Sequence, residues 1–212
     1  LLLEKNLQLG RDRLAAMQKN YGYDSVALVD ARGRTLLTVG EPDPVPQAIR
    51  AQINEAMAKG NVQMTDLHRH ADGRVNLHFL APLVSKAGSR TVGAVILSVN
   101  PELFLFPLVQ SWPMATQSGE TLLVRRDGDS VLYLTELRGK EDASLSLRLP
   151  LYALQLPAAA ALRESRAGAM SGVNYRGVPV LSAWRPVART NWMLLAKLDR
   201  DEVLHAAHST AL

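Results

Sequence analysis

The sequence contains no cysteine among its 212 residues. This absence excludes disulfide bonds, catalysis by a thiolate and zinc sites with thiolate ligands. Long apolar runs are absent too, and no segment approaches the roughly 20 apolar residues that a transmembrane helix needs. The chain begins with Leu1-Leu-Leu3 and not with methionine. We expect it to be a segment that starts just after a membrane helix.

Concentrated positive charge is also lacking. The formal net charge is +4, but the lysines and arginines are scattered, and Arg125-Arg126 is the single adjacent basic pair. Domains that bind nucleic acid usually carry a basic stripe or patch. We therefore expect no nucleic-acid partner.

The motifs of common catalytic sites are missing as well. The sequence has no Gly-x-Ser-x-Gly nucleophile elbow and no glycine-rich phosphate loop. Its acidic residues are dispersed, and several stand at expected turns, where aspartate is favoured for local reasons. We predict no catalytic residue, no cofactor and no enzyme activity for this segment.

What the sequence does contain is a duplication. Residues 26–37, VALVDARGRTLL, reappear as residues 121–132, TLLVRRDGDSVL, at a shift of 95 positions (121 − 26). The ends of the two halves also match, with residues 80–83 and 92–100 resembling residues 184–187 and 192–199. A repeat of this length exceeds the roughly 20–50 residues of a solenoid unit. It indicates two small domains of one kind in tandem.

Residues 1–22 are predicted to form a helix with one apolar stripe. The stripe residues recur at spacings of four and three, the heptad pattern of a packing seam: Leu3, Leu7, Gly10, Leu14, Met17 and Tyr21. Two interpretations stay open. The stripe packs on its own domain, or it is a parallel homodimer seam formed by Leu3, Leu7, Leu14 and Met17.

Each half predicts a five-stranded antiparallel sheet with helices on one face, and thus an α+β fold. In the first half we expect strands 25–30, 35–39, 62–70, 74–84 and 91–99, and a helix through Ile49, Ile53 and Met57 that stops at Gly60. In the second half we expect a helix from Asn100-Pro101 across 103–112, strands 121–126, 130–134, 169–175, 178–187 and 192–198, and an alanine-rich helix stopped by Gly168. Asp199 and Glu202 predict a capping box at the start of a last helix.

The predicted organisation is therefore a helix at 1–22, a module at 23–105, a second module at 106–199 and an exit helix at 200–212. The connection between strands two and three differs between the modules. It is short and proline-rich in the first, and long and helical in the second, over residues 135–167. We expect function to depend on these unrepeated parts.

Two stretches carry a resemblance to a known family. Residues 119–134 resemble the double Cache domains, the tandem PAS-like extracytoplasmic sensors of bacterial transmembrane signalling proteins, and residues 175–187 with 192–199 resemble that family's membrane-proximal module. The resemblance implies a small-molecule sensor on the periplasmic side of an inner-membrane protein. It implies a histidine kinase output, with a diguanylate cyclase as the alternative. A structural or dimerisation module without a ligand is the other interpretation.

Polar and aromatic residues near the expected pockets are the candidates for a ligand site. They are His68, His70, Asn76 and His78 in the first module, and Tyr152, Tyr175, Trp184 and Arg185 in the second. The family's amino-acid-binding motif combines Arg, Trp, Tyr and Asp in the distal module. The first module here has no tryptophan, so that motif is absent.

The turn after His70 decides whether the histidines of the first module come together. A two-residue loop at Asp72-Gly73 places His78 on the face opposite to His68. A three-residue loop with a bulge pairs His70 with Arg74 instead, and brings all three histidines onto one face. We predict no metal site, because zinc needs ligands of matched geometry.

Overall fold

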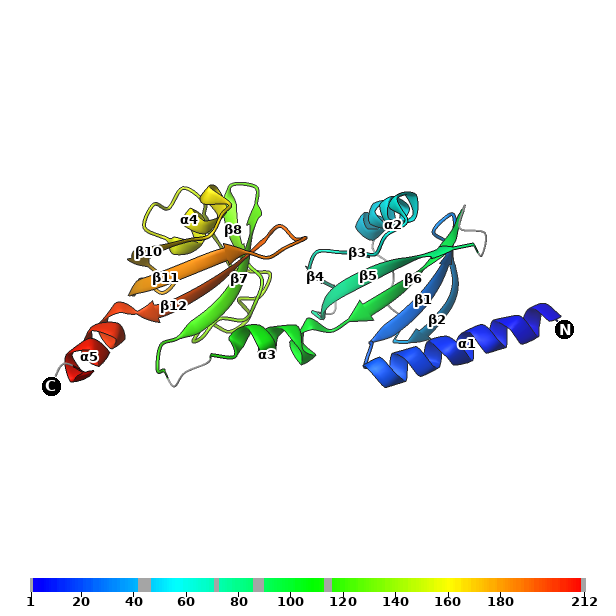
Figure 1. Cartoon of the computed structure of the whole chain (residues 1–212), viewed down its shortest axis with the longest axis horizontal. Coiled ribbons are helices and arrows are strands. Elements are labelled where there is room, and N and C mark those ends of the chain that lie inside the picture. Colours follow the sequence, from blue (N-terminus) through cyan, green and yellow to red (C-terminus); the bar gives the residue numbers. More distant parts are fainter. Residues whose placement is uncertain (1, 42–46, 71–72, 86–89, 113–115, 211–212) are drawn as a thin grey trace. The chain divides into compact units, whose positions relative to one another are not determined.

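The computed structural model describes residues 2–41, 47–70, 73–85, 90–112 and 116–210 (Figure 1). The chain divides into two compact units, Leu1–Pro101 and Glu102–Leu212, and each has its own antiparallel sheet. The predicted α+β fold, with a long N-terminal helix and two such sheets, is confirmed. No helix within the described ranges is both long enough and apolar enough to cross a membrane.

Unit 1 is built on one sheet of six strands. Its elements are α1 (Leu2–Tyr21), β1 (Ser25–Asp30), β2 (Thr35–Gly40), α2 (Gln47–Lys59), β3 (Gln63–Met64), β4 (His68–Arg69), β5 (Val75–Val84) and β6 (Thr91–Val99). The strand order is β2-β1-β6-β5-β3, and β4 also pairs with β5. Met64 pairs with Phe79 but His68 pairs with Asn76, so β5 meets one extra residue of its partner between these pairs. This bulge divides the predicted strand 62–70 into β3 and β4.

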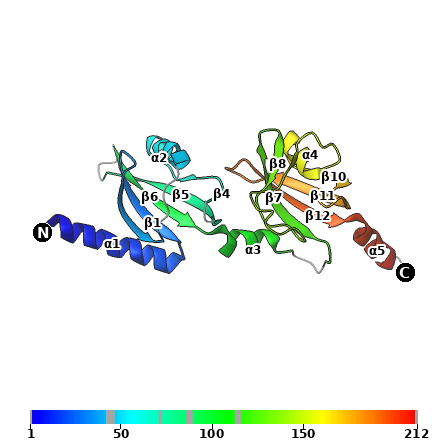
Figure 2. The same cartoon turned by 180° about the vertical axis from the view of Figure 1, so that it is seen from behind.

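Helices cover both faces of this sheet. Val26 packs with Leu14 of α1, whereas the next residue, Ala27, packs with Ile53 of α2. Successive residues of a strand point to opposite faces, so the unbroken apolar run of β1 is buried on both sides. The prediction of helices on one face is wrong for this unit, because α1 and α2 lie on opposite sides of the sheet (Figure 2).

The second half of α1 packs on its own sheet. Leu14 is only 8% exposed, and Met17 packs against the same apolar cluster. A Cβ placed on Gly10 would lie 3.2 Å from a leucine side chain of β2. Leu7, in contrast, is 41% exposed, and the side chain of Leu3 lies outside the described residues. The stripe therefore packs within the domain from Gly10 to Met17, whereas Tyr21 at its end is 71% exposed.

Unit 2 repeats this plan with a longer central connection. After the 3-10 turn η1 (Pro101–Leu103) come α3 (Leu105–Gln110), β7 (Glu120–Asp127), β8 (Ser130–Tyr133), β9 (Arg148–Pro150), α4 (Pro157–Glu164), β10 (Gly168–Val173), β11 (Pro179–Pro186), β12 (Trp192–Asp199) and α5 (Arg200–Thr210). The strand order is β10-β11-β12-β7-β8-β9. The long connection contributes β9, which raises the predicted five strands to six.

Two helix boundaries in unit 2 differ from the prediction. The helix expected from Asn100-Pro101 is a 3-10 turn, and α3 follows only at Leu105. The alanine-rich helix α4 ends at Glu164 with Ser165 as its C-cap, and not at Gly168, which is the first residue of β10. Ser165 takes a left-handed conformation with φ 55° and donates its N–H to the Ala161 carbonyl, which closes the helix.

The duplicated segments form the first hairpin of each unit. β1 pairs with β2 around Gly33, at φ 73°, and β7 pairs with β8 around Gly128, at φ 60°. Glycine adopts positive φ without the steric penalty of a Cβ. The predicted glycine turns are confirmed at both places. In each unit the hairpin then lies beside the last strand, since β1 pairs with β6 and β7 with β12.

Candidate functional site

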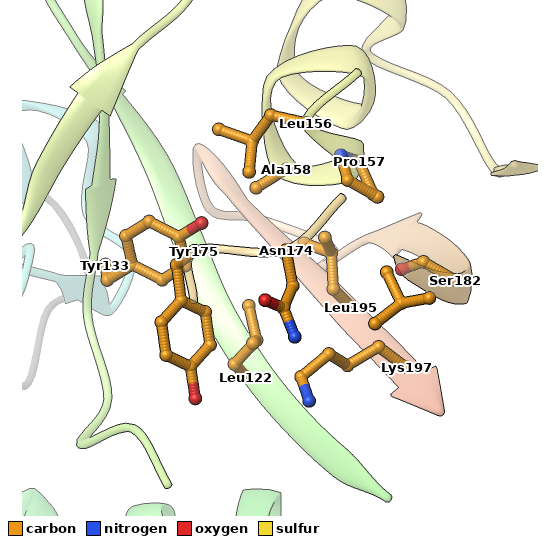
Figure 3. A pocket seen from close by; sticks show the side chains of 11 residues that line it. Leu122, Tyr133, Leu156, Pro157, Ala158, Asn174, Tyr175, Ser182, Leu195 and Lys197 are labelled. Atoms are coloured by element: carbon orange, nitrogen blue, oxygen red, sulfur yellow. The ribbon is translucent and has the colours of Figure 1, made fainter. Parts of the chain in front are cut away.

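A cavity lies between α4 and the sheet of unit 2 (Figure 3). It holds about 270 Å³ of space between atoms, part of which is open to solvent, and about 20 Å³ of it can hold the centre of a water molecule. The lining residues are Leu122, Tyr133, Leu156, Pro157, Ala158, Asn174, Tyr175, Val180, Ser182, Leu195 and Lys197. The cavity thus has mainly apolar walls with a few polar groups, as small-ligand sites usually have.

Strand register brings two charged residues beneath α4. On β12, Leu195 faces Leu122 of β7, and two residues further on Lys197 faces Glu120. Residues two apart on a strand share a face, so this charged pair continues the apolar row of the sheet. Lys197 Nζ lies 3.0 Å from Glu120 Oε2, and the two side chains are 4% and 7% exposed. Each charge therefore depends on the other in a place that water hardly reaches.

The Glu120 carboxylate also binds two further donors. Tyr175 Oη donates to it, at 2.9 and 3.0 Å from its two oxygens. The backbone N–H of Arg138 donates at 2.8 Å. Burial raises the pKa of the Tyr175 hydroxyl, and the charge of Glu120 raises it further. Tyr175 consequently remains a protonated donor over the ordinary pH range.

Asn174 presents an unused donor to the cavity. Its Oδ1 accepts the backbone N–H groups of Arg176 at 2.8 Å and Val178 at 3.2 Å, which determines how the amide is turned. Its Nδ2 is buried and donates to none of the described residues, and Asn174 as a whole is 8% exposed. A buried donor without an acceptor costs about 1–3 kcal/mol. A bound acceptor is therefore favoured at this point.

The polar network continues to the first turn of α5. Ser118 Oγ accepts the Asp199 N–H at 2.9 Å and donates to the Glu202 carboxylate. The Glu202 carboxylate also accepts hydrogen bonds from Thr116 Oγ1 at 2.7 Å and from the N–H groups of Gln117 and Ser118 at 3.0 and 2.9 Å. These bonds, led by the Ser118 hydroxyl, lower the pKa of Glu202 to about 2. The predicted capping box is wrong, because Ser118 and not Glu202 satisfies the Asp199 N–H.

The four candidates of the first module lie together in unit 1. The His70 N–H donates to the Arg74 carbonyl at 2.8 Å, and His68 pairs with Asn76, so the described residues have the pairing of His70 with Arg74. Ala71 and Asp72 of the predicted turn lie outside the described residues. The His68 and His78 rings stack with centroids 5.0 Å apart. His68 Nε2 lies 3.1 Å from His70 Nε2.

Hydrogen bonds tie this cluster to the neighbouring strand β6. Asn76 Nδ2 donates to Ser98 Oγ at 2.9 Å, and His78 Nε2 lies 3.4 Å from the same oxygen. Asn76 and His78 are each 1% exposed. In the described part of the chain, no group of three or more His, Cys, Asp or Glu residues is arranged to hold a metal ion.

The candidates of the second module have different positions. Tyr175 lines the cavity. Trp184 is 4% exposed and packs in the core, with its Nε1 donating to the Arg166 carbonyl at 3.1 Å. Tyr152 is 78% exposed, and Arg185 stands on the exposed side of β11. Neither of these two lines the cavity.

Sequence reasoning missed Glu120, Asn174 and Lys197. A signal was available for the two charged residues. Lys197 follows Met193 and Leu195 at every second position of a strand, and Glu120 precedes Leu122 in the same way. A charge at a core-facing position of a strand needs a partner. No comparable signal marked Asn174.

No family model matches the sequence, and no curated protein matches it. Solved structures do match. The extracellular domain of mmHK1S-Z2, a protein assigned as a histidine kinase, has a TM-score of 0.67 at 14% identity, covering 93% of this chain and 83% of its own. The ligand-binding domain of the Pseudomonas fluorescens chemoreceptor CtaA, in complex with L-leucine, has a TM-score of 0.60 at 15% identity. The match covers 92% of this chain and 78% of the CtaA domain.

A third match comes from another class of protein. A domain of a sensory box/GGDEF family protein from Vibrio parahaemolyticus has a TM-score of 0.63 at 14% identity, covering 95% of this chain and 81% of its own. These likenesses concern the fold. The chain has the fold of extracellular sensor and ligand-binding domains, in agreement with the double Cache resemblance of its sequence.

Proposed function

We propose that this chain is the extracytoplasmic, small-molecule-sensing domain of a membrane-bound signalling protein. Residues 23–105 would form its membrane-distal module and residues 106–199 its membrane-proximal module. Two observations support the proposal: the fold shared with extracellular sensor domains, and a mainly apolar cavity with a few polar groups.

The observation that carries the proposal is a polar path from the cavity to the last helix. Lys197, in the cavity wall, has its Nζ 3.4 Å from the Ser118 carbonyl oxygen. The Ser118 hydroxyl in turn donates to Glu202 of α5. A displacement of Lys197 therefore reaches α5 through two consecutive contacts.

A ligand in the cavity would act by binding one arrangement of α5 better than another, since only such a difference shifts an equilibrium. The ligand would contact Lys197 and Tyr175, which both bind Glu120. A rearrangement that moves Lys197 would also affect Ser118, and through it the hydrogen bonds that attach the first turn of α5.

The output that we propose is a cytoplasmic histidine kinase, with this chain on the periplasmic side of an inner membrane. The extracellular domains of several proteins assigned as histidine kinases support this choice. A diguanylate cyclase is the alternative, favoured by the GGDEF neighbour.

The proposal includes a homodimer along α1, in which the exposed Leu7 would contact the partner while Leu14 stays in its own core.

Hydrogen exchange of α5 tests this function. A thermal-shift screen of organic acids, amino acids, amines and uncharged amides on the 212-residue chain would first identify a compound that raises the melting temperature. With that compound bound, we expect altered exchange at the backbone amides of α5 and of residues 116–118. The altered exchange at α5 should be lost in Glu202→Gln, with ligand affinity kept.

Asp201→Asn provides the matched control, because Asp201 is an exposed carboxylate in the same turn of α5. This variant should respond to the ligand as the unchanged chain does. A screen in which no compound raises the melting temperature would favour the structural, ligand-free module instead. Binding that leaves the exchange of α5 unchanged would contradict the proposed path.

A further inference from the structure

We infer that the cavity of unit 2 takes a small uncharged molecule that offers a hydrogen-bond acceptor, such as an amide or ketone carbonyl, to Asn174. The inference rests on the proposed sensor function and narrows its ligand to one chemical class. Three features of the cavity carry it: a donor without an acceptor, a neutral set of surrounding charges and a small space with apolar walls.

The donor is Asn174 Nδ2. The amide cannot turn over without losing the bonds that Oδ1 accepts from the Arg176 and Val178 N–H groups. The nitrogen is thereby held among the lining residues, on the side of Leu122 and Lys197 in Figure 3. A ligand acceptor satisfies this nitrogen, whereas a ligand donor would leave two groups unpaired.

The charges around the cavity argue against an ionic ligand. Lys197 Nζ lies 3.0 Å from Glu120 and 3.8 Å from Asp199, and Asp199 lies 3.5 Å from Arg176. Two cations thus face two carboxylates. A carboxylate ligand would add a third negative charge, and Lys197 is the one cation among the described residues that line the cavity. An ammonium ligand would be repelled by the charge of Lys197, and it would offer no acceptor to the Asn174 donor.

Space and wall chemistry limit the size of the ligand. The part of the cavity that admits the centre of a water molecule is about 20 Å³, within about 270 Å³ that is partly open to solvent. Leu122, Leu156 and Leu195 offer apolar contacts to a methyl group. A carbonyl that carries one or two methyl-sized groups fits both the donor and these walls.

Acetamide and acetate are matched probes, because they differ in charge and hardly in shape. In an NMR titration of the 212-residue chain, we expect acetamide to shift the Asn174 side-chain amide resonances until they saturate. The dissociation constant should be roughly millimolar, as for other ligands of this size. Acetate at the same concentrations should leave these resonances in place. An equal response to acetate, or no response to acetamide, overturns the inference.

Two variants assign the binding to this cavity. Asn174→Asp keeps an oxygen for the Arg176 and Val178 N–H groups but removes the donor, and should weaken acetamide binding about tenfold or more. Ala158→Val fills the cavity and should abolish binding, while Ala183→Val, on the exposed side of β11, should leave it unchanged.

Binding of acetamide that persists in both cavity variants would overturn the assignment. The two proposals also fail in different ways. A charged ligand found in the thermal-shift screen, together with no response to acetamide, removes this inference and leaves the sensor function standing. A screen without any ligand removes the sensor function itself.

Discussion

Lys197 and Glu120 occupy core-facing positions of β12 and β7, and each is the partner of the other. Removing one member of a buried ion pair leaves an uncompensated charge where water cannot solvate it. We therefore expect Lys197→Met to lower the free energy of unfolding of unit 2 by about 3–5 kcal/mol. Urea unfolding followed by tryptophan fluorescence measures this, because all three tryptophans lie in unit 2.

The double variant Glu120→Gln/Lys197→Met is the control for this loss. Glutamine keeps an oxygen for Tyr175 Oη and for the Arg138 N–H, and it removes the buried negative charge. The double variant should therefore be more stable than Lys197→Met alone. An equal loss in both would mean that side-chain packing, and not the unpaired charge, dominates.

At the scale of residues, the sequence indicates some members of the site and not their partners. Tyr175 was predicted as a candidate and does line the cavity. The pairing of Lys197 with Glu120 depends on the register between two strands whose paired residues are 77 positions apart (197 − 120). Local patterns do not determine such a register. The unused donor of Asn174 follows from the geometry of one turn, which the residue type alone does not reveal.

At the scale of elements, Glu202 attaches α5 to residues 116–118 in a pH-dependent way. Its hydrogen bonds lower its pKa from 4.5 to about 2. A carboxyl with a lowered pKa in the folded state stabilises that state above its unfolded pKa, and this contribution is lost as the pH falls toward the folded pKa. We expect the attachment of α5 to weaken between pH 4.5 and about pH 2.

The amide resonances of Gln117 and Ser118 report this step, since both N–H groups donate to Glu202. Followed by NMR as the pH is lowered, they should titrate together with the loss of protection in α5. In Glu202→Gln the step should be absent. A step that persists in the variant would assign the titration to another carboxyl group.

The stripe of α1 yields a second prediction at this scale. Leu14 is buried against the sheet and Leu7 is exposed. Leu14→Asp should therefore destabilise unit 1, because it places a charge in an apolar cluster. Leu7→Asp should leave the fold intact and weaken the proposed homodimer. Circular dichroism measures the first effect and sedimentation the second. A wild-type chain that stays monomeric at high concentration would contradict the dimer.

Elements with a local signal were the ones that the sequence predicted well. Glycine at positive φ marked both hairpins, and the spacing of Ile49 and Ile53 marked α2. The stop of α4 was misplaced because Ser165, a residue with a Cβ, adopts the left-handed conformation there. The break between β3 and β4 was missed, since a bulge depends on the partner strand and not on the strand itself.

At the scale of the whole molecule, the duplication explains the two similar sheets, and the connection that differs between the two units explains the cavity. In each unit the first strand of the repeated hairpin pairs with the last strand, β1 with β6 and β7 with β12, so these strands have equivalent neighbours in the two sheets. The cavity is roofed by Leu156, Pro157 and Ala158, which belong to the long connection 135–167 of unit 2. The repeated halves supply the sheet, and the unrepeated segment supplies the enclosed space above it. The expectation that function depends on the unrepeated parts is thus consistent with the position of the cavity.

Each unit has apolar clusters of its own, and this predicts separate responses to mutation. Ile53 belongs to the core of unit 1 and Met193 to that of unit 2. Truncating either residue to alanine removes buried apolar contacts worth about 2–5 kcal/mol. We expect Ile53→Ala to accelerate hydrogen exchange in β1 and β6 about 30-fold or more, with β7 and β12 unaffected. Met193→Ala should give the reverse pattern. Accelerated exchange in all four strands from either variant would show that the duplicated units unfold as one.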